Sequence, residues 1–384
     1  MTDLTDSSPA YRLITSADDL KRIMPDLMDE TVVAVDVEAD SMYHFSERAC
    51  LIQMATPAAC LLIDPLAVGD LSALRPLFLS PAITKIFHGA SYDVHCLDKC
   101  CHISISNLFD TEIACRFLGL AESGLNAVVQ QTFGITLDKK YQKKNWSQRP
   151  LPPEMLAYAA RDVLYLIPLW TILKQRLREK QRTAWVDEEC RLISIARPAA
   201  DDDRPLFLKV KGSGRLDRRG LAVLENLLKK RLEIARRKDL PPFKILSNTA
   251  LMRLAEERPG DPRALKRSKI LSEKQLSMYA DPVCQAIGKA LAASDGALPV
   301  YPRQRQAPLS RKASLRVDAL KQWREVAAGK IEMDASLILP NALVIDIARK
   351  KPQDLAQLDN VAEMKQWQKD VFGQEIVDVV KTLT

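Results

Sequence analysis

Four carboxylates and a tyrosine lie along the first half of the chain in a pattern that suits chemistry with hard metal ions. Asp36 and Glu38 are two residues apart at the end of an apolar run, Asp93 follows further along, and Tyr158 precedes Asp162 by four positions. Oxygen ligands without accompanying cysteine or histidine favour Mg²⁺ or Mn²⁺ over zinc. Two such ions side by side activate a water molecule and stabilise the leaving oxygen when a phosphodiester is cleaved.

The elements predicted around these residues bring their side chains together in pairs. Residues 31–37 form a short β-branched run typical of a buried strand, so Asp36 and Glu38 leave it on the same side. Tyr158 and Asp162 stand at i and i+4 of a predicted helix and share a face. Two charges on one buried face are costly unless a cation neutralises them. The phenol of Tyr158, with an ordinary pKa near ~10, suits the orientation of a water molecule rather than the role of a base.

An ordinary role for the same acids stays open at this point. A chain with 49 acidic residues has some of them at any chosen spacing, as caps, surface charges or salt-bridge partners. For Asp36 and Glu38, directly after an apolar strand, this alternative is the weaker one. For Asp93 or Asp162 taken singly it is the stronger one, so the combination of motifs has to decide.

Apolar runs and helical spacing predict a mixed α/β sheet in the first half of the chain. Strand-like runs occur at 31–37, 50–55, 59–65 and 83–87, and the pattern becomes helical after 108–110. Helical spacing occurs at 71–78, 92–99, 111–118, 124–133 and 153–180. We expect the first three strands to form a meander.

Clusters of proline and charged residues divide the chain, whose 384 residues exceed one ordinary core. Two helical stretches beyond the first cluster are weakly related copies, because Leu224-x-x-Leu227 in one parallels Leu320-x-x-Trp323 in the other. The predicted organisation is an α/β domain (1–197), a linker (198–212), a small all-α domain (213–292), a second linker (293–312) and a second all-α domain (313–384).

Basic residues concentrate away from the carboxylates. Residues 1–180 hold 18 basic and 22 acidic residues, whereas residues 181–384 hold 38 and 27. Residues 204–274 alone hold 20 basic and 8 acidic residues, with basic runs at 229–231 and 236–238 on one predicted helix. Such a patch suits salt-sensitive phosphate binding, and a solvated helix face is the alternative. The second helical copy is nearly neutral, so we expect it to pack against its neighbours instead.

Eight cysteines in so long a chain do not make a disulfide scaffold, and we expect them to be reduced. Cys96, Cys100, Cys101 and His102 offer four zinc-type ligands, but two adjacent cysteines are poor geometry for one tetrahedral ion, and thiols on a helix are the better interpretation. The sequence shows neither a secretory signal nor an obvious membrane span, which predicts a cytoplasmic protein.

Three motifs in order carry a resemblance to a known family. Val33-Ala-Val-Asp-Val-Glu38, the segment 85–93 ending in Asp93, and Tyr158-x-x-x-Asp162 resemble the motifs of the DEDD exonuclease superfamily in its tyrosine-bearing branch. Within that branch the chain looks most like ribonuclease D, to which segments 50–53, 107–111 and 140–151 are also similar. The two helical copies resemble the helicase-and-RNase-D C-terminal (HRDC) domain. The resemblance implies a ribonuclease H-like exonuclease domain followed by two HRDC domains.

The resemblance also implies roles for the matching residues. Asp36, Glu38 and Asp162 hold the metal nearer the attacking water. Asp36 bridges to a second ion, Asp93 binds that ion directly or through water, and Tyr158 positions the nucleophile. The residue between the first two acids is often threonine in this family and is Val37 here, which leaves the metal ligands complete.

Five further residues are candidate substrate contacts. Gln53 is a candidate for the terminal nucleotide and His88 for the phosphate at the scissile end, although each also suits a packed structural position. Trp146, Lys143 and Lys144 lie in a basic run interleaved with aromatic residues, which suits a single-stranded backbone and stacked bases. A solvated charge run is the alternative.

We therefore predict a metal-dependent 3′–5′ exoribonuclease that releases nucleoside 5′-monophosphates, with tRNA 3′ ends as the substrates that the resemblance implies. The expected cofactors are two divalent ions, Mg²⁺ or Mn²⁺, and the expected protein is a monomer that binds RNA. We expect no membrane partner and no ATP, since the phosphate-binding loop of a helicase motor is missing from the sequence. The alternatives are a DNA exonuclease of the same superfamily and a catalytically silent RNA-binding protein.

Overall fold

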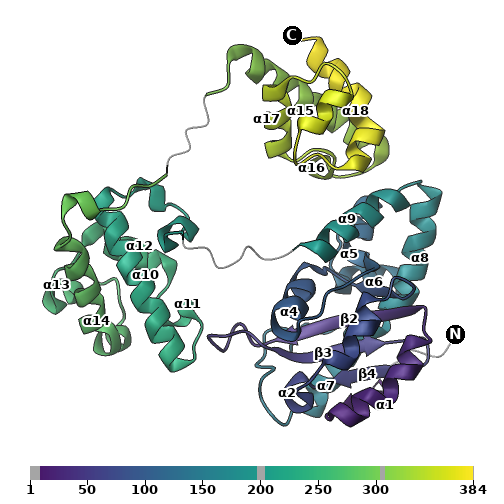
Figure 1. The fold of residues 1–384 in the computed structure, drawn as a ribbon, viewed down its shortest axis with the longest axis horizontal. Coiled ribbons are helices and arrows are strands. Elements are labelled where there is room, and N and C mark those ends of the chain that lie inside the picture. Colours follow the sequence, from purple (N-terminus) through teal and green to yellow (C-terminus); the bar gives the residue numbers. More distant parts are fainter. Residues whose placement is uncertain (1–8, 197–203, 303–307, 384) are drawn as a thin grey trace. The chain divides into compact units, whose positions relative to one another are not determined.

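The computed structural model of the protein describes residues 9–196, 204–302 and 308–383. It divides into two compact units (Figure 1). One unit contains residues 1–39, 49–197 and 307–384, and the other contains residues 40–48 and 198–306. The first unit carries the sheet and the second helical domain, and the second unit carries the first helical domain.

A single mixed sheet organises the N-terminal part of the described chain. Its strands are β1 (Arg12–Ile14), β2 (Val32–Ala39), β3 (Ala49–Ala55), β4 (Cys60–Ile63), β5 (Thr84–Phe87) and β6 (Leu108–Asp110). They lie in the order β1-β4-β3-β2-β5-β6. Strand β3 is antiparallel to both β2 and β4, which is the meander expected from the sequence, and β2, β5 and β6 run parallel.

Helices cover both faces of this sheet. They are α1 (Ala17–Met28), α2 (Pro65–Val68), α3 (Arg75–Leu79), α4 (Ser91–Cys101), α5 (Thr111–Phe117), α6 (Leu125–Phe133), α7 (Pro153–Leu164), α8 (Leu166–Glu179) and α9 (Thr183–Ile195). Val32 and Ala34 of β2 pack in one cluster with α7, whereas Val33, Val35 and Val37 pack in another with α1 and α4. This period of two decides which side chains of β2 meet α7.

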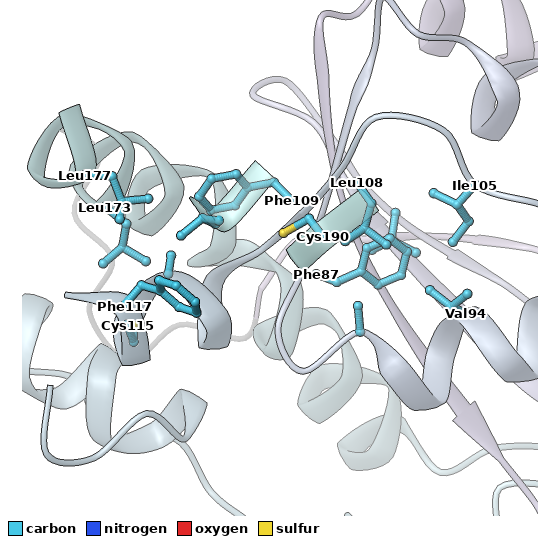
Figure 2. Packing of buried hydrophobic residues seen from close by; sticks show 14 of the residues in the cluster. Phe87, Val94, Ile105, Leu108, Phe109, Cys115, Phe117, Leu173, Leu177 and Cys190 are labelled. Atoms are coloured by element: carbon cyan, nitrogen blue, oxygen red, sulfur yellow. The ribbon is translucent and has the colours of Figure 1, made fainter. Parts of the chain in front are cut away.

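The core on the second face of the sheet extends to α8 and α9. Figure 2 shows the thiol of Cys190 among Leu108, Phe109 and Phe87. The Sγ atom of Cys190 accepts a hydrogen bond from the backbone N–H of Asp110 at 3.2 Å. All eight cysteines are free thiols, as expected, and Cys96 and Cys101 are buried on α4.

The stretch Pro153–Glu179, which comprises α7 and α8, is by length and composition apolar enough to cross a membrane, and within the described ranges it is the one such helix. Its residues Met155, Leu156 and Val163 pack against the sheet, and Leu169 and Leu173 lie in the other core cluster. A core helix passes the same test of length and composition, and this stretch is a core helix. The single helix expected over 153–180 is interrupted at Tyr165.

The second helical domain packs on helix α9. It contains α15 (Arg311–Ile331), α16 (Ala335–Ile338), α17 (Asn341–Lys350) and α18 (Gln366–Lys381). The rings of Trp185 and Trp367 stack at a centroid distance of 5.1 Å. Lys365 Nζ lies 2.5 and 2.6 Å from the two carboxylate oxygens of Glu189. The nearly neutral second copy therefore packs against its neighbour, as its composition indicated.

The first helical domain forms a separate core in the other unit. Its helices are α10 (Arg218–Lys238), α11 (Pro242–Ile245), α12 (Asn248–Glu257), α13 (Pro262–Arg267) and α14 (Glu273–Leu291). Phe207 and Val210 are buried in this core, so it begins before residue 213, inside the predicted linker 198–212. Leu298 and Tyr301 of the predicted linker 293–312 also pack on it. Residues 198–203 and 303–307 of these two linkers lie outside the described residues.

The basic patch expected on α10 is smaller than its sequence suggests. Arg231 donates to the carbonyl oxygen of Leu246 at 3.0 Å. Arg219 donates to backbone carbonyls at the C-terminal end of α14, and Lys230 pairs with Glu233 at 2.6 Å. Arg219 and Arg231 therefore hold the helical domain together, whereas Lys229, Arg236, Arg237 and Lys238 are exposed.

Candidate active site

Strand β2 presents two carboxylates on the face that α7 covers. Asp36 and Glu38 continue the even-numbered series of Val32 and Ala34, and both are half-buried. Their register partners on β3 are Gln53 and Leu51. The strand therefore points both acids toward the helix that carries the next motif.

Helix α7 supplies the partners of these acids. One ligand oxygen each from Asp36, Glu38 and Asp162 lies within 4.8 Å of the others. The hydroxyl of Tyr158 forms a hydrogen bond with the carboxylate of Asp162, one turn further along the helix. Burial, followed by the charge of Asp162, raises the pKa of Tyr158, so its hydroxyl stays protonated and available as a donor. The spacing of these residues in the sequence predicted this shared face.

Asp93 belongs to the same electrostatic cluster but stands apart from the three-residue group. It is buried in the first turn of α4 and is 6% exposed. Burial and then the charge of Asp36 raise its pKa well above the ordinary value, and the backbone N–H of Val37 opposes this shift. Asp93 therefore lies close enough to Asp36 for the two charges to interact, and its role as a ligand of a second cation stays a prediction.

The acids raise one another's pKa values. Burial raises the pKa of Asp36 to about 6. Burial and then the charges of Asp36, Asp162 and Asp93 raise the pKa of Glu38 well above its usual range, and the pKa of Asp162 rises for the same kind of reason. Clustered buried carboxylates of this kind are stabilised by a bound divalent cation. The all-oxygen donor set fits Mg²⁺ or Mn²⁺.

Gln53 lies behind the carboxylates rather than on an open surface. Its side chain is fully buried, and its Nε2 donates to Asp36 Oδ2 at 3.2 Å. This position corrects the interpretation of Gln53 as a contact for the terminal nucleotide and agrees with the packed alternative. Its contact orients a candidate metal ligand.

His88 ties the end of β5 to the start of α5. Its Nδ1 lies 2.9 Å from Thr111 Oγ1, which itself donates to the carbonyl of Phe87, so Nδ1 is the donor. Its Nε2 is buried and has no hydrogen-bond partner among the described residues. Burial lowers the pKa of His88, which favours the neutral ring. These contacts support a structural role for His88, which the sequence left open beside a phosphate contact.

Asp110 is a positioning residue whose role sequence reasoning did not assign. Its carboxylate accepts from the backbone N–H groups of Gly89 and Ala90 at 2.9 and 2.8 Å, and from that of Glu112 at 2.8 Å. It thereby fixes the turn that leads into α4 and Asp93. The only signal in the sequence was its place in the segment 107–111 that resembles ribonuclease D.

Trp146 does not offer a stacking face to a substrate. Its side chain is 1% exposed, and its ring centroid lies 6.2 Å from that of Tyr158. The expectation that Trp146 stacks on a single-stranded base is therefore corrected. Lys143 and Lys144 of the same segment are exposed, as expected.

Comparisons with known proteins agree with this geometry. Residues 11–178 match the 3′-5′ exonuclease family, and residues 220–287 and 315–380 each match the HRDC domain. Sheet, acid cluster and helical domains together define a 3′–5′ exonuclease of the DEDD type that carries two HRDC domains.

Relatives that align with most of the chain identify its family within this class of exonucleases. The chain is 29% identical over 373 residues to ribonuclease D of Bartonella henselae, covering 96% of this chain and 90% of that protein. It is 30% identical over 310 residues to ribonuclease D of Desulfotalea psychrophila, covering 79% and 82%. This chain belongs to the ribonuclease D family. The crystal structure of Escherichia coli RNase D shares the fold, with a TM-score of 0.76 over 97% of this chain and 99% of that one at 24% identity.

These findings confirm the fold class, the exonuclease class and the two HRDC domains predicted from the sequence. HRDC domains on a ribonuclease D homologue also imply that the chain binds nucleic acid.

Proposed function

We propose that the protein is a metal-dependent 3′–5′ exoribonuclease that releases nucleoside 5′-monophosphates. The observation that carries this proposal is the convergence of Asp36, Glu38 and Asp162 within 4.8 Å, with the Tyr158 hydroxyl bonded to Asp162. Neither a serine nor a cysteine nucleophile is needed, because the chemistry is the attack of water on a phosphodiester.

The residues of the chain have distinct tasks in this proposal. Asp36, Glu38 and Asp162 would hold one divalent ion, and Asp36 and Asp93 would hold a second. When bound, the two ions supply activation of the attacking water and stabilisation of the leaving oxygen. Tyr158 keeps its proton and orients the water by hydrogen bonding. Asp110 and Gln53 hold the elements that carry the acids.

The substrates in this proposal are 3′ ends of structured RNA, such as those of tRNA precursors. Support comes from E. coli RNase D, described as an exoribonuclease involved in structured RNA processing. Lys143 and Lys144, exposed on the segment that leads to α7, supply positive charge for an RNA backbone. We propose a monomer that works in the cytoplasm.

The test uses two substrates of equal sequence, one RNA and one DNA, labelled at the 5′ end. We expect stepwise shortening of the RNA in Mg²⁺ or Mn²⁺, and loss of shortening in EDTA and in Asp36→Ala. Chromatography of the released nucleotides should give 5′-monophosphates. No shortening of either substrate contradicts the enzyme proposal.

Preferential shortening of the DNA strand would instead support a DNA exonuclease of the same superfamily. The substrate class is tested further with a tRNA that carries a 3′ extension and with an unstructured RNA of the same length. Faster trimming of the unstructured strand would argue against structured RNA as the preferred substrate.

A further inference from the structure

The segment that leads into α7 is fastened to the sheet by one arginine. Arg149 Nε and Nη2 donate to the two carboxylate oxygens of Asp64 at 2.7 Å each, and Nη2 also donates to the carbonyl of Cys50 at 2.7 Å. Its Nη1 donates to the carbonyl of Trp146 at 2.7 Å. Asp64 in turn accepts from backbone N–H groups at the start of α2. A guanidinium held on both sides in this way fixes the segment relative to β3 and β4.

The segment that Arg149 holds in place positions the buried ring of Trp146 near Tyr158. Trp146 is 1% exposed, packs in the cluster between α7 and the sheet, and lies 6.2 Å from Tyr158 with an angle of 37° between the rings. Its Nε1 is buried and has no hydrogen-bond partner among the described residues. An unsatisfied buried donor costs about 1–3 kcal/mol, a cost that a purely apolar side chain in this place would avoid.

We propose that Trp146 and Arg149 are positioning residues that hold the Tyr158 ring in the orientation needed to direct the attacking water. Arg149 fixes Trp146 through its backbone carbonyl, and Trp146 supports the Tyr158 ring from the buried side. The proposal rests on the proposed nuclease function, because Tyr158 has to act on the water for its orientation to matter. It predicts that both residues act through Tyr158 and through no other group.

The kinetic test compares full-length wild type, Trp146→Leu, Arg149→Lys, Tyr158→Phe and the double variant Trp146→Leu/Tyr158→Phe. We expect each of the first two changes to lower kcat by about 10- to 100-fold, because small displacements of a positioned group have effects of this size. KM for RNA should stay within about two-fold. In the Tyr158→Phe background, Trp146→Leu should lower kcat by less than about three-fold, because its route of action is already gone. Trp146→Phe, which keeps an aromatic ring, should restore most of the activity.

A matched control separates positioning from general stability. Arg182 also has a buried guanidinium bonded to backbone carbonyls, those of Phe117 and Ile331, away from the acids. Arg182→Lys should lower the melting temperature at least as much as Arg149→Lys and leave kcat unchanged. Multiplicative effects of Trp146→Leu and Tyr158→Phe on kcat would overturn the proposal, and so would a rise in KM with kcat unchanged. Arg149→Lys carries the same test if Trp146→Leu does not fold.

A second readout does not depend on nuclease activity. In protein labelled with 3-fluorotyrosine, the ¹⁹F resonance of Tyr158 is the one missing from Tyr158→Phe. We expect this resonance to shift and broaden in Trp146→Leu and Arg149→Lys, and to stay in place in Arg182→Lys. An unchanged resonance in the first two variants overturns the positioning proposal, whereas a shifted resonance in a protein without nuclease activity contradicts only the proposed function.

Discussion

The side-chain amide of Gln53 donates to Asp36 Oδ2 at 3.2 Å across the paired strands β2 and β3. Its amide oxygen is buried without a hydrogen-bond partner among the described residues. A neutral donor in this place orients the Asp36 carboxylate, which would be a metal ligand in the proposed site, and it adds no charge to the cluster. The second strand of the meander therefore contributes to the site without contributing an acid.

Replacing Gln53 by methionine tests this orientation. Gln53→Met keeps the length of the side chain and removes the donor to Asp36. Because a hydrogen bond to a charged group contributes about 1.5–3 kcal/mol, we expect kcat/KM to fall by about 10-fold or more. The Mg²⁺ concentration for half-maximal activity should rise. Met54→Leu, a volume-conserving change on the opposite face of β3, should change neither quantity; a fully active Gln53→Met protein would show that Asp36 needs no such partner.

The raised pKa values predict how stability depends on pH in the absence of metal. Burial raises the pKa of Asp36 from 3.8 to about 6, so between these values the folded protein holds a proton that the unfolded chain releases. The free energy of unfolding in EDTA should therefore fall as the pH rises from about 4 to 6. Divalent cations should reverse the loss because they bind the folded acids.

Asp162→Asn isolates this effect. The change removes one of the mutually repelling charges, so we expect a higher melting temperature than wild type in EDTA at pH 7.5. It also removes a metal ligand, so added Mg²⁺ or Mn²⁺ should no longer raise the melting temperature. Glu122→Gln, an exposed change on the α5–α6 loop, serves as the control with wild-type behaviour. A lower melting temperature of Asp162→Asn in EDTA would contradict the repulsion argument.

Lys85 gives a second pH-dependent prediction away from the site. Its side chain is fully buried on β5 and donates to the carbonyls of Ser80 and Ile83 at 2.6 and 2.7 Å. Burial lowers its pKa from 10.5 to about 8. Between these values the unfolded chain holds the proton that the folded protein has lost, so this group makes the free energy of unfolding rise with pH.

Urea denaturation of Lys85→Met and wild type at pH 7.5, 9 and 10 measures this slope. The variant should be less stable throughout, because two buried carbonyls lose their donor, and its stability should rise less over this range. Lys99→Met, on the exposed side of α4, should keep the wild-type slope. Parallel curves for Lys85→Met and wild type would show that the amine does not titrate in this window.

The local pattern of the sequence predicted the strands and the acids well. Thr31–Val37 is a run that only a buried strand explains, and the positions of Asp36 and Glu38 then follow from a period of two. The edge strand Arg12–Ile14 was not predicted because three residues carry too little pattern. Helices α1 and α9 were also not identified. The break at Tyr165 is marked by Pro168 in the first turn of α8, because a proline has no N–H to donate to the carbonyl of Leu164, and the single helix expected over 153–180 did not take this signal into account.

The surroundings of the acids depended on contacts between distant residues. Trp146 lies in a run of lysines, so its neighbours in sequence indicated an exposed ring. Its burial follows from the bonds of Arg149 to Asp64 and Cys50, which are far away along the chain. For Gln53 the sequence left both a nucleotide contact and a packed position open, and its hydrogen bond to Asp36 across the paired strands supports the packed position. Residue type and spacing identify ligands, whereas the groups that orient them are found from tertiary contacts.

The exposed lysines of the same segment give a prediction about RNA affinity. Lys143→Ala/Lys144→Ala should raise KM for RNA and leave kcat unchanged. Each lost phosphate contact lowers the slope of log affinity against log salt by about 0.7 for a single strand, so two contacts give about 1.4. Lys21→Ala/Lys99→Ala removes the same charge elsewhere and should keep the wild-type slope. An unchanged slope in the first variant would mean that these lysines do not contact the backbone of the RNA.

Gly119 follows α5 and lies in close contact with the second helical domain. Substitutions at Gly119 therefore test how tightly this domain packs there. Its φ is +80°, and an added Cβ would collide with the backbone carbonyl of Glu332 at the end of α15. Gly134 has a similar φ of +74° and open space around it. Gly134→Ala therefore introduces backbone strain without a steric clash. We expect Gly134→Ala to destabilise by about 1–2 kcal/mol and Gly119→Ala by clearly more. Hydrogen exchange should speed up in α15 and α18 only in Gly119→Ala, since only there must the helical domain shift. Equal effects of the two changes would contradict a close contact between Gly119 and Glu332.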